Sequence, residues 1–174
     1  LIANHLMQKN ICVPPREEHS KETKYEGAYV KEPILGGHDW IVSFDINSLY
    51  PHIIIQYNIS PEKILGESGQ GVDVNRMIDM KIPLNYLKTE GACITPNGAK
   101  FKNDSQGFLP EMMEKMYNDR VTYKQRMIKA KKEYQKNPSK ELTREIARCH
   151  NIQWSKKIAL NSAYGAVGNQ YFRY

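Results

Sequence analysis

The second half of the sequence contains two long helical segments separated by one tight break. We expect the first to start at Pro110 and to run to about Lys136, roughly 40 Å at the rise of an α-helix. Asn137-Pro138-Ser139 interrupts it, and Ser139 is expected to cap a second helix that runs to about Gly165. Because two helices joined by so short a turn must lie antiparallel, the sequence predicts a long helical hairpin.

Cationic side chains recur at regular spacing on both segments. In the first segment a spacing of three or four residues places on one face Met113, Tyr117, Arg120, Lys124 and Met127. In the second segment the same spacing places on one face Lys157, Asn161 and Tyr164. If the two faces look the same way, three cations converge, and like charges converge only where an anion neutralises them or water screens them. A triphosphate is such an anion, and a hairpin with solvated charges is the alternative.

The first half of the chain contains a short apolar run that ends at a carboxylate. Residues 40–42 are apolar and partly β-branched, which predicts a strand buried on both faces. Asp45 follows at the end of this strand, where a carboxylate is costly unless something compensates it. Pro51 can open a helix over residues 52–57. Taken alone, Asp45 is better explained by a structural role, as a helix cap or an ion-pair partner, than by a functional one.

Shorter elements complete an expected α+β fold. Asn97-Gly98 predicts the turn of a β-hairpin between residues 92–95 and 99–102. Ser60 is expected to cap a short helix that begins at Pro61. We also expect helical segments at residues 1–8, 74–80 and 84–88, a linker over residues 9–24, and a loop marked by Gly66, Gly69 and Gly71.

The composition favours a polyanionic partner. The 174 residues carry a formal charge of +6, which suggests nucleic acid or nucleotides. Three cysteines without a Cys-x-x-Cys spacing imply neither a disulfide framework nor a zinc site, so a reducing cytoplasm is expected. We expect no membrane association, because no apolar run could cross a bilayer and no signal peptide is visible. Since the chain starts at Leu1, we expect it to be a piece of a longer protein.

Two stretches resemble sequence motifs of the family B DNA polymerases. Residues 43–51 are similar to motif A (Asp-x-x-Ser-Leu-Tyr-Pro), with His52 in place of the small Ser that usually follows. Residues 157–165 are similar to motif B, and Asn118-x-Arg120-x-x-x-Lys124 resembles the first fingers helix of the T-even-like phage branch. The resemblance extends from about Tyr25 to Tyr174.

This resemblance implies a domain organisation. Residues 1–24 would be the end of a helix and a linker, and residues 25–107 a partial palm domain whose β-sheet contains the β-hairpin and motif A. Residues 108–166 would form the fingers as a long antiparallel helical hairpin with motif B. Residues 167–174 would return to the palm.

The resemblance also implies roles for individual residues. Asp45 would be a catalytic metal ligand, joined by the backbone carbonyl of Ile46, for two Mg²⁺ ions. The second carboxylate would lie outside this chain, because motif C (Tyr-Gly-Asp-Thr-Asp) does not occur in it. The incoming nucleotide would be bound by Ser48, Leu49, Tyr50, Arg120, Lys124, Lys157 and Asn161. The base-pair pocket would include Tyr164 and Gly165, the template contact Tyr25 and Gly27, and Tyr50 would exclude the ribose 2′-hydroxyl.

The expected function is therefore part of a replicative DNA polymerase that adds deoxynucleotides to a primer 3′ end. Its partners would be primer–template DNA, deoxynucleoside triphosphates, a sliding clamp, and the rest of the enzyme, which carries motif C, the thumb and the exonuclease. It would act in the cytoplasm, that of the host cell if a phage encodes it. We expect no activity from the chain alone, and an apolar surface left exposed at residues 40–44. The alternatives are a non-catalytic nucleic-acid-binding helical module and a stand-alone nucleotide-binding regulator.

Overall fold

The computed structural model describes residues 2–12, 30–67, 76, 79–81, 88–89 and 91–169. These ranges leave out most of the expected linker, the template-contact residues Tyr25 and Gly27, and most of the two short helices expected at residues 74–80 and 84–88. Within them the fold is mixed, with long packed helices and a small antiparallel sheet, so the predicted α+β class is confirmed.

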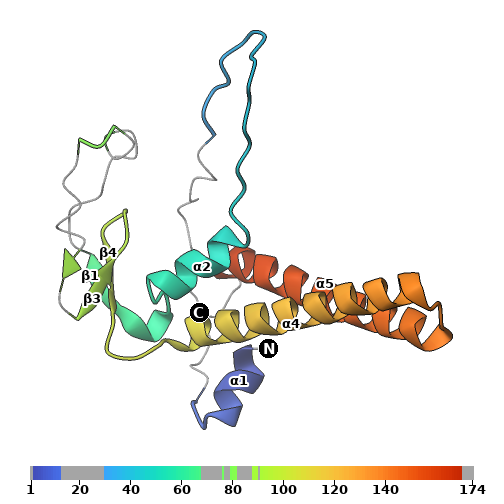
Figure 1. Cartoon of the computed structure of the whole chain (residues 1–174). Helices are drawn as coiled ribbons and strands as arrows, with labels where there is room; N and C mark the ends of the chain where they lie inside the picture. The colour runs from blue at the N-terminus through green and yellow to red at the C-terminus, as the bar shows by residue number, and fades with distance from the viewer. Residues whose placement is uncertain are drawn as a thin grey trace.

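The helical hairpin is the largest feature of the described structure, and its prediction is confirmed. Helix α4 spans Phe108–Lys136 and helix α5 spans Lys140–Val167, and the two lie side by side (Figure 1). Pro110 is the third residue of α4, where its missing N–H costs no intrahelical bond. Ser139 caps α5 as expected, because the backbone N–H of Leu142 donates to its Oγ at 3.1 Å.

Helix α2, Leu49–Gln56, crosses the base of the hairpin and closes the main core (Figure 1). This core consists of Ile54, Leu109, Met112, Met113, Met116 and Leu160. Each such side chain contributes about 1.5–3 kcal/mol when it is fully buried. Helix α1, Ile2–Gln8, lies against the base of α4, where Lys9 and His5 pair with Glu111. Lys9 is the larger cause of the lowered pKa of the Glu111 carboxyl.

Four short strands form an antiparallel sheet beside α2. They are β1 (Ile64–Glu67), β2 (Lys88–Thr89), β3 (Ala92–Ile94) and β4 (Ala99–Lys102), in the order β1-β4-β3-β2. Strands β3 and β4 form the predicted hairpin, in which Cys93 pairs with Phe101, and Gly98 takes a φ of 90° in the turn. Gly66 corrects one expectation: it lies within β1, beside a bulge and with a φ of 114°, rather than in a loop.

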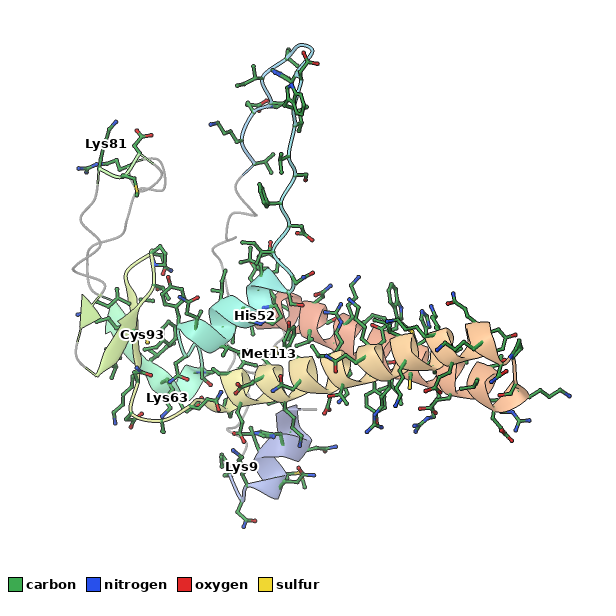
Figure 2. All side chains as sticks on the ribbon, in the orientation of Figure 1. Lys9, His52, Lys63, Lys81, Cys93 and Met113 are labelled. Carbon is green, nitrogen blue, oxygen red and sulfur yellow. The ribbon has the colours of Figure 1, made fainter. Side chains whose placement is uncertain are left out.

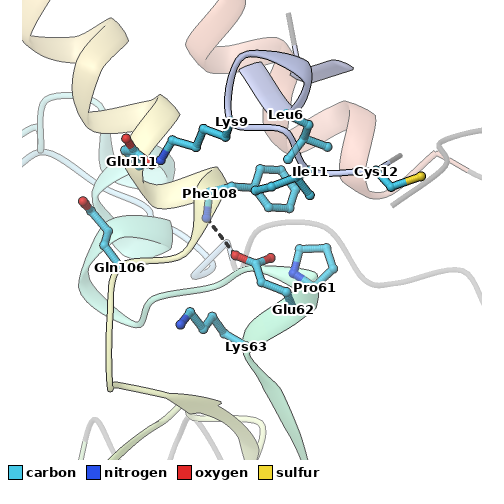
Figure 3. A pocket seen from close by; sticks show the side chains of 10 residues that line it. All are labelled: Leu6, Lys9, Ile11, Cys12, Pro61, Glu62, Lys63, Gln106, Phe108 and Glu111. Atoms are coloured by element: carbon cyan, nitrogen blue, oxygen red, sulfur yellow. Dashed lines mark hydrogen bonds and ion pairs between the residues drawn. The ribbon is translucent and has the colours of Figure 1, made fainter. Parts of the chain in front are cut away.

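Three side chains from one short segment hold the first turn of α4. The backbone N–H of Gly107 donates to Asn58 Oδ1 at 2.8 Å, that of Phe108 to Glu62 Oε1 at 2.8 Å, and that of Leu109 to Ser60 Oγ at 3.3 Å. Figure 3 shows the bond between Phe108 and Glu62. Without these acceptors the donors at a helix start are unsatisfied. The segment is therefore an N-terminal cap for α4 that comes from some fifty residues earlier in the chain.

This arrangement corrects the expected role of Ser60. A short 3₁₀ turn, η1 (Pro61–Lys63), does begin at Pro61, but the Ser60 side chain does not cap it. Its hydroxyl instead donates to Glu62 at 2.6 Å and accepts from Leu109. A Cβ added at Gly107 would lie 2.5 Å from the Ser60 Cβ, so the two backbones approach closely at this point.

The prediction of a buried strand at residues 40–42 is wrong. Residues 30–47 have no helix or strand and extend away from the helices as a long protrusion (Figure 1). Trp40 is 99% exposed and Phe44 is 90% exposed, which confirms the expectation of an uncovered apolar surface. A strand needs a neighbour to satisfy its N–H and C=O groups, and no described segment pairs with this one.

No helix among the described residues is both long enough and apolar enough to cross a membrane.

Candidate functional site

The motif A turn ends in a strained residue that two other side chains hold. Ser48 precedes α2 with a φ of 56° and a ψ of 44°, a left-handed conformation that costs a non-glycine residue energy. Arg120 Nη1 donates to Ser48 Oγ at 3.0 Å, and His52 Nδ1 lies 2.9 Å from the Ser48 carbonyl oxygen, to which it can only donate. Because both the side chain and the carbonyl are engaged, the turn is fixed in this conformation.

Two aromatic pairs connect α2 to both helices of the hairpin. The rings of Tyr50 and Tyr164 stack, with centroids 4.5 Å apart and an interplanar angle of 14°. The ring of His52 meets that of Tyr117 edge-on, with centroids also 4.5 Å apart. Such pairs add about 0.5–1.5 kcal/mol beyond the area they bury. The motif A residues are therefore joined to α4 through Tyr117 and Arg120, and to α5 through Tyr164.

The predicted cations occupy one stretch of the hairpin but make different contacts. Lys156 of α5 pairs with Asp119 of α4 at 2.7 Å, which sets the level at which the neighbouring Lys157 and Arg120 lie along the hairpin. Arg120 contacts Ser48, whereas the Lys157 ammonium lies 5.0 Å from the centre of the Trp154 ring. Lys124 is exposed on α4.

One hydrogen-bond donor of the Arg120 guanidinium is unsatisfied in the described structure. Its Nε is buried and has no hydrogen-bond partner among the described residues. A buried cationic donor without an acceptor is costly unless something supplies one. This donor is closed to solvent here, so a ligand could reach it only if the Arg120 side chain moved.

The remaining predicted nucleotide and base-pair residues lie close along the chain to these contacts. Asn161 and Gly165 are exposed on α5, and Leu49 and Tyr50 each keep 42% of their surface. Tyr164 is 40% exposed although it stacks on Tyr50. This end of the hairpin is therefore accessible to a ligand.

Asp45 and Ile46 lie on the exposed segment that leads into the Ser48 turn. Carboxylate and backbone carbonyl oxygens are ligands that Mg²⁺ prefers, so both donors fit this ion in type. They do not complete a site by themselves: the described residues contain no group of three or more His, Cys, Asp or Glu side chains that could hold a metal ion. Asp45 does not end a buried strand, as the sequence predicted, because that strand does not form.

A cavity near the base of the hairpin shares none of the predicted site residues. It has a volume of about 410 Å³ and lies between α1, η1 and the start of α4 (Figure 3). Leu6, Ile11 and Phe108 give it an apolar wall, and Lys9 and Glu111 flank it. This surface is a junction between elements rather than part of the motif A and motif B site.

Sequence reasoning missed the contacts of His52 and Trp154. His52 stood out only as a departure from the motif A pattern, and its bond to Ser48 depends on a turn that the sequence did not reveal. Trp154 precedes Lys157 by three residues, a spacing that places two helical side chains next to each other and that predicts their contact. Figure 2 shows His52 at the junction of α2 with the hairpin.

Comparison with known proteins gives a consistent result. The family model for DNA polymerase family B matches residues 1–173. The chain is similar over its whole length to the DNA-directed DNA polymerases of Escherichia phage RB69, at 30% identity, and of Enterobacteria phage T4, at 27% identity. It spans 23% of the length of each of these two proteins. It is also 31% identical to DNA polymerase 1 of Pyrococcus abyssi, over 89% of the chain and 17% of that protein.

Proposed function

Because the chain belongs to DNA polymerase family B, we propose that it supplies the incoming-nucleotide site and one catalytic carboxylate of a DNA-directed DNA polymerase. The observation that carries this proposal is the junction of motif A with motif B. Arg120 bonds Ser48, and Tyr50 stacks on Tyr164, so residues from three parts of the chain meet at one accessible place. The reaction is the addition of a deoxynucleotide to a primer 3′ end.

In this proposal the hairpin binds the triphosphate. Arg120, Lys124 and Lys157 contact the phosphate oxygens, the first as a planar donor of paired hydrogen bonds and the other two as compact charges. Backbone groups of Ser48 and Leu49 meet the same phosphates.

The base and sugar would lie where the two tyrosines meet. Asn161, Tyr164 and Gly165 line the nascent base pair, and the ring of Tyr50 lies under the sugar and excludes a 2′-hydroxyl. The observed stack of Tyr50 on Tyr164 supports placing the sugar and base sites next to each other.

Asp45 and the Ile46 carbonyl would hold metal in this enzyme. Two Mg²⁺ ions stabilise the attacking and leaving oxygens of a phosphoryl transfer when they are bound. We propose that the second carboxylate comes from outside this chain, since Asp45 is its one motif carboxylate. Asp45 lies three residues before Ser48, so the arginine-bound turn fixes one end of the segment that carries it.

We propose the same partners that the family resemblance implied. They are primer–template DNA, with Tyr25 and Gly27 near the template, deoxynucleoside triphosphates, a sliding clamp, and the palm, thumb and exonuclease of the same enzyme. Activity in the cytoplasm also stays a prediction.

Neutralising the cations tests this proposal. In a polymerase that contains this chain, Arg120→Ala, Lys124→Ala and Lys157→Ala should each raise the KM for deoxynucleotides by roughly tenfold to a hundredfold, the scale of one charge-assisted contact. The loss should be the same for all four bases, because the phosphates are common to them. Steady-state incorporation kinetics on a fixed primer–template measures it.

Lys136→Ala is the matched control, because Lys136 is a cation in the last turn of α4, far along the helix from Arg120. It should leave the nucleotide KM unchanged. If the three variants instead bind primer–template more weakly and keep a normal nucleotide KM, the hairpin is a nucleic-acid-binding module and the alternative function is favoured.

A further inference from the structure

One face of α5 continues beyond the proposed nucleotide site and carries an exposed tryptophan. Starting from Asn161, the helical spacing leads through Lys157 and Trp154 to His150. Trp154 keeps 49% of its surface exposed. It lies seven residues from Asn161, about 10 Å along the helix axis. Part of the indole is therefore open to a ligand.

The side chains around Trp154 form a flat, cationic group. The His150 ring lies parallel to the indole, with an interplanar angle of 9° and centroids 6.2 Å apart. The Lys157 ammonium lies 5.0 Å from the indole centroid, within the range of a cation–π contact. A parallel pair of rings with a neighbouring cation is a surface on which another flat aromatic ring can stack.

The hairpin around this group is strongly basic. Residues 120–157 contain twelve Lys or Arg and three Asp or Glu, a net charge of +9, whereas the whole chain has a net charge of +6. Lys124, Arg126, Arg144 and Arg148 are among the exposed cations. A polyanion is the partner that such a surface attracts.

We propose that Trp154, together with His150 and Lys157, is a stacking site for the bases of single-stranded DNA, whose phosphates follow the basic hairpin. An aromatic platform within a basic surface is how proteins hold unpaired strands without reading their sequence. Duplex DNA fits less well, because its bases already stack on one another and only its phosphates are available. If the proposed function holds, this strand is the unpaired template ahead of the insertion site. Only this identification of the strand rests on the proposed function; the stacking site itself does not.

Tryptophan fluorescence tests this site directly. The chain has two tryptophans, Trp40 and Trp154, so Trp40→Phe leaves Trp154 as the only reporter. The 174-residue Trp40→Phe chain is titrated with oligothymidylate of about twelve nucleotides, without nucleotide triphosphate or Mg²⁺. We expect saturable quenching, and much weaker quenching by an abasic oligomer of the same length, because only bases stack on the indole.

Substitutions then measure the contribution of the ring. Affinity from fluorescence anisotropy of a labelled oligothymidylate should fall about tenfold or more in Trp154→Ala, as expected for the loss of one stacked base. It should be largely retained in Trp154→Phe, which keeps an aromatic face. Ile158→Ala is the matched control, since Ile158 is 52% exposed one turn further along α5 and has no ring. Circular dichroism checks that each variant keeps the parent's helix content.

Three outcomes would overturn the proposal: equal affinity of Trp154→Ala and the parent, equal quenching by the abasic oligomer, or equally strong binding of a blunt duplex. In each case charge alone explains the binding. A Trp154→Ala polymerase that changes only its nucleotide KM would also overturn it and would make Trp154 a positioning residue for Lys157. Because the oligonucleotide assays contain no nucleotide, failure of the proposed nucleotide site does not affect their result.

Discussion

Ser48 accepts two of the hydrogen bonds that join the candidate site, one from Arg120 and one from His52. Its left-handed backbone costs on the order of 1–3 kcal/mol, and the bonds from Arg120 and His52 offset that cost. The same conformation directs the next two residues, Leu49 and Tyr50, into α2. The ring of Tyr50 then stacks on that of Tyr164 in α5.

Tyr50→Ala should let ribonucleotides in more readily. In a polymerase that contains this chain, the ratio of kcat/KM for deoxynucleotides to that for ribonucleotides should fall by about tenfold or more, because the ring that we propose to exclude a 2′-hydroxyl is removed. Deoxynucleotide use should change less. Single-nucleotide incorporation with matched pairs of dNTP and rNTP measures the ratio.

Tyr50→Phe is the control for this prediction, since it keeps the ring and its stack on Tyr164 and removes only the hydroxyl. It should discriminate like the parent. An unchanged ratio in Tyr50→Ala would assign Tyr50 to packing against Tyr164.

For single residues, the sequence predicts those contacts that form between close neighbours along the chain. Ser139 could be identified as a cap because a capping residue acts within three positions of itself. The contact of Arg120 with Ser48 could not be derived from either residue, since it joins positions 72 residues apart. Only the resemblance to a family grouped these two residues.

Among the elements, α4 and α5 form from short-range periodicity, and their ends were predicted within about two residues. The strand expected at residues 40–42 depended on a distant partner, and its apolar composition could not reveal whether one was present. The three-residue cap of α4 escaped prediction for the same reason. Asn58, Ser60 and Glu62 look like the start of a local helix in sequence and act on another helix in space.

Gly107→Ala should loosen the start of α4. The new methyl group would lie 2.5 Å from the Ser60 Cβ and 3.1 Å from Glu62 Oε1, so the cap must move to admit it. We expect a loss of about 1–3 kcal/mol in the free energy of unfolding, the range for overpacking. Urea denaturation followed by circular dichroism measures it.

Gly165→Ala provides the comparison, because a Cβ at Gly165 meets nothing within 4 Å. It should be neutral or stabilising by up to about 1 kcal/mol, the helix propensity difference. If Gly107→Ala unfolds at the same urea concentration as the parent, the first turn of α4 does not depend on its approach to Ser60.

For the whole molecule, we predict that the purified 174-residue chain does not extend a primer, with or without Mg²⁺. One motif carboxylate cannot hold two ions in the geometry of in-line displacement. The chain should show strong helical circular dichroism from α4 and α5, and it should associate through the exposed residues 30–47 in size-exclusion chromatography. Activity should return when a partner that carries motif C is supplied.

Template-dependent incorporation by the chain alone would contradict this prediction. It would mean that Asp39 or Asp104 completes the metal site. Asp104 already pairs with Lys63 and Lys102, and the Lys102 bond, followed by that of Lys63, holds the pKa of its carboxyl well below the usual range.

The anchored start of α4 makes the hairpin a lever. Asn58, Ser60 and Glu62 fix the end at Gly107, while Arg120 lies about 20 Å and Lys136 about 44 Å further along the helix. Any rotation about the fixed end therefore moves the tip more than twice as far as the arginine. A swing that advances Arg120 by about 3 Å, the length of one hydrogen bond, carries the tip through about 7 Å. By the same ratio, a force applied at the tip of the hairpin produces more than twice that force at Arg120, where α4 contacts Ser48.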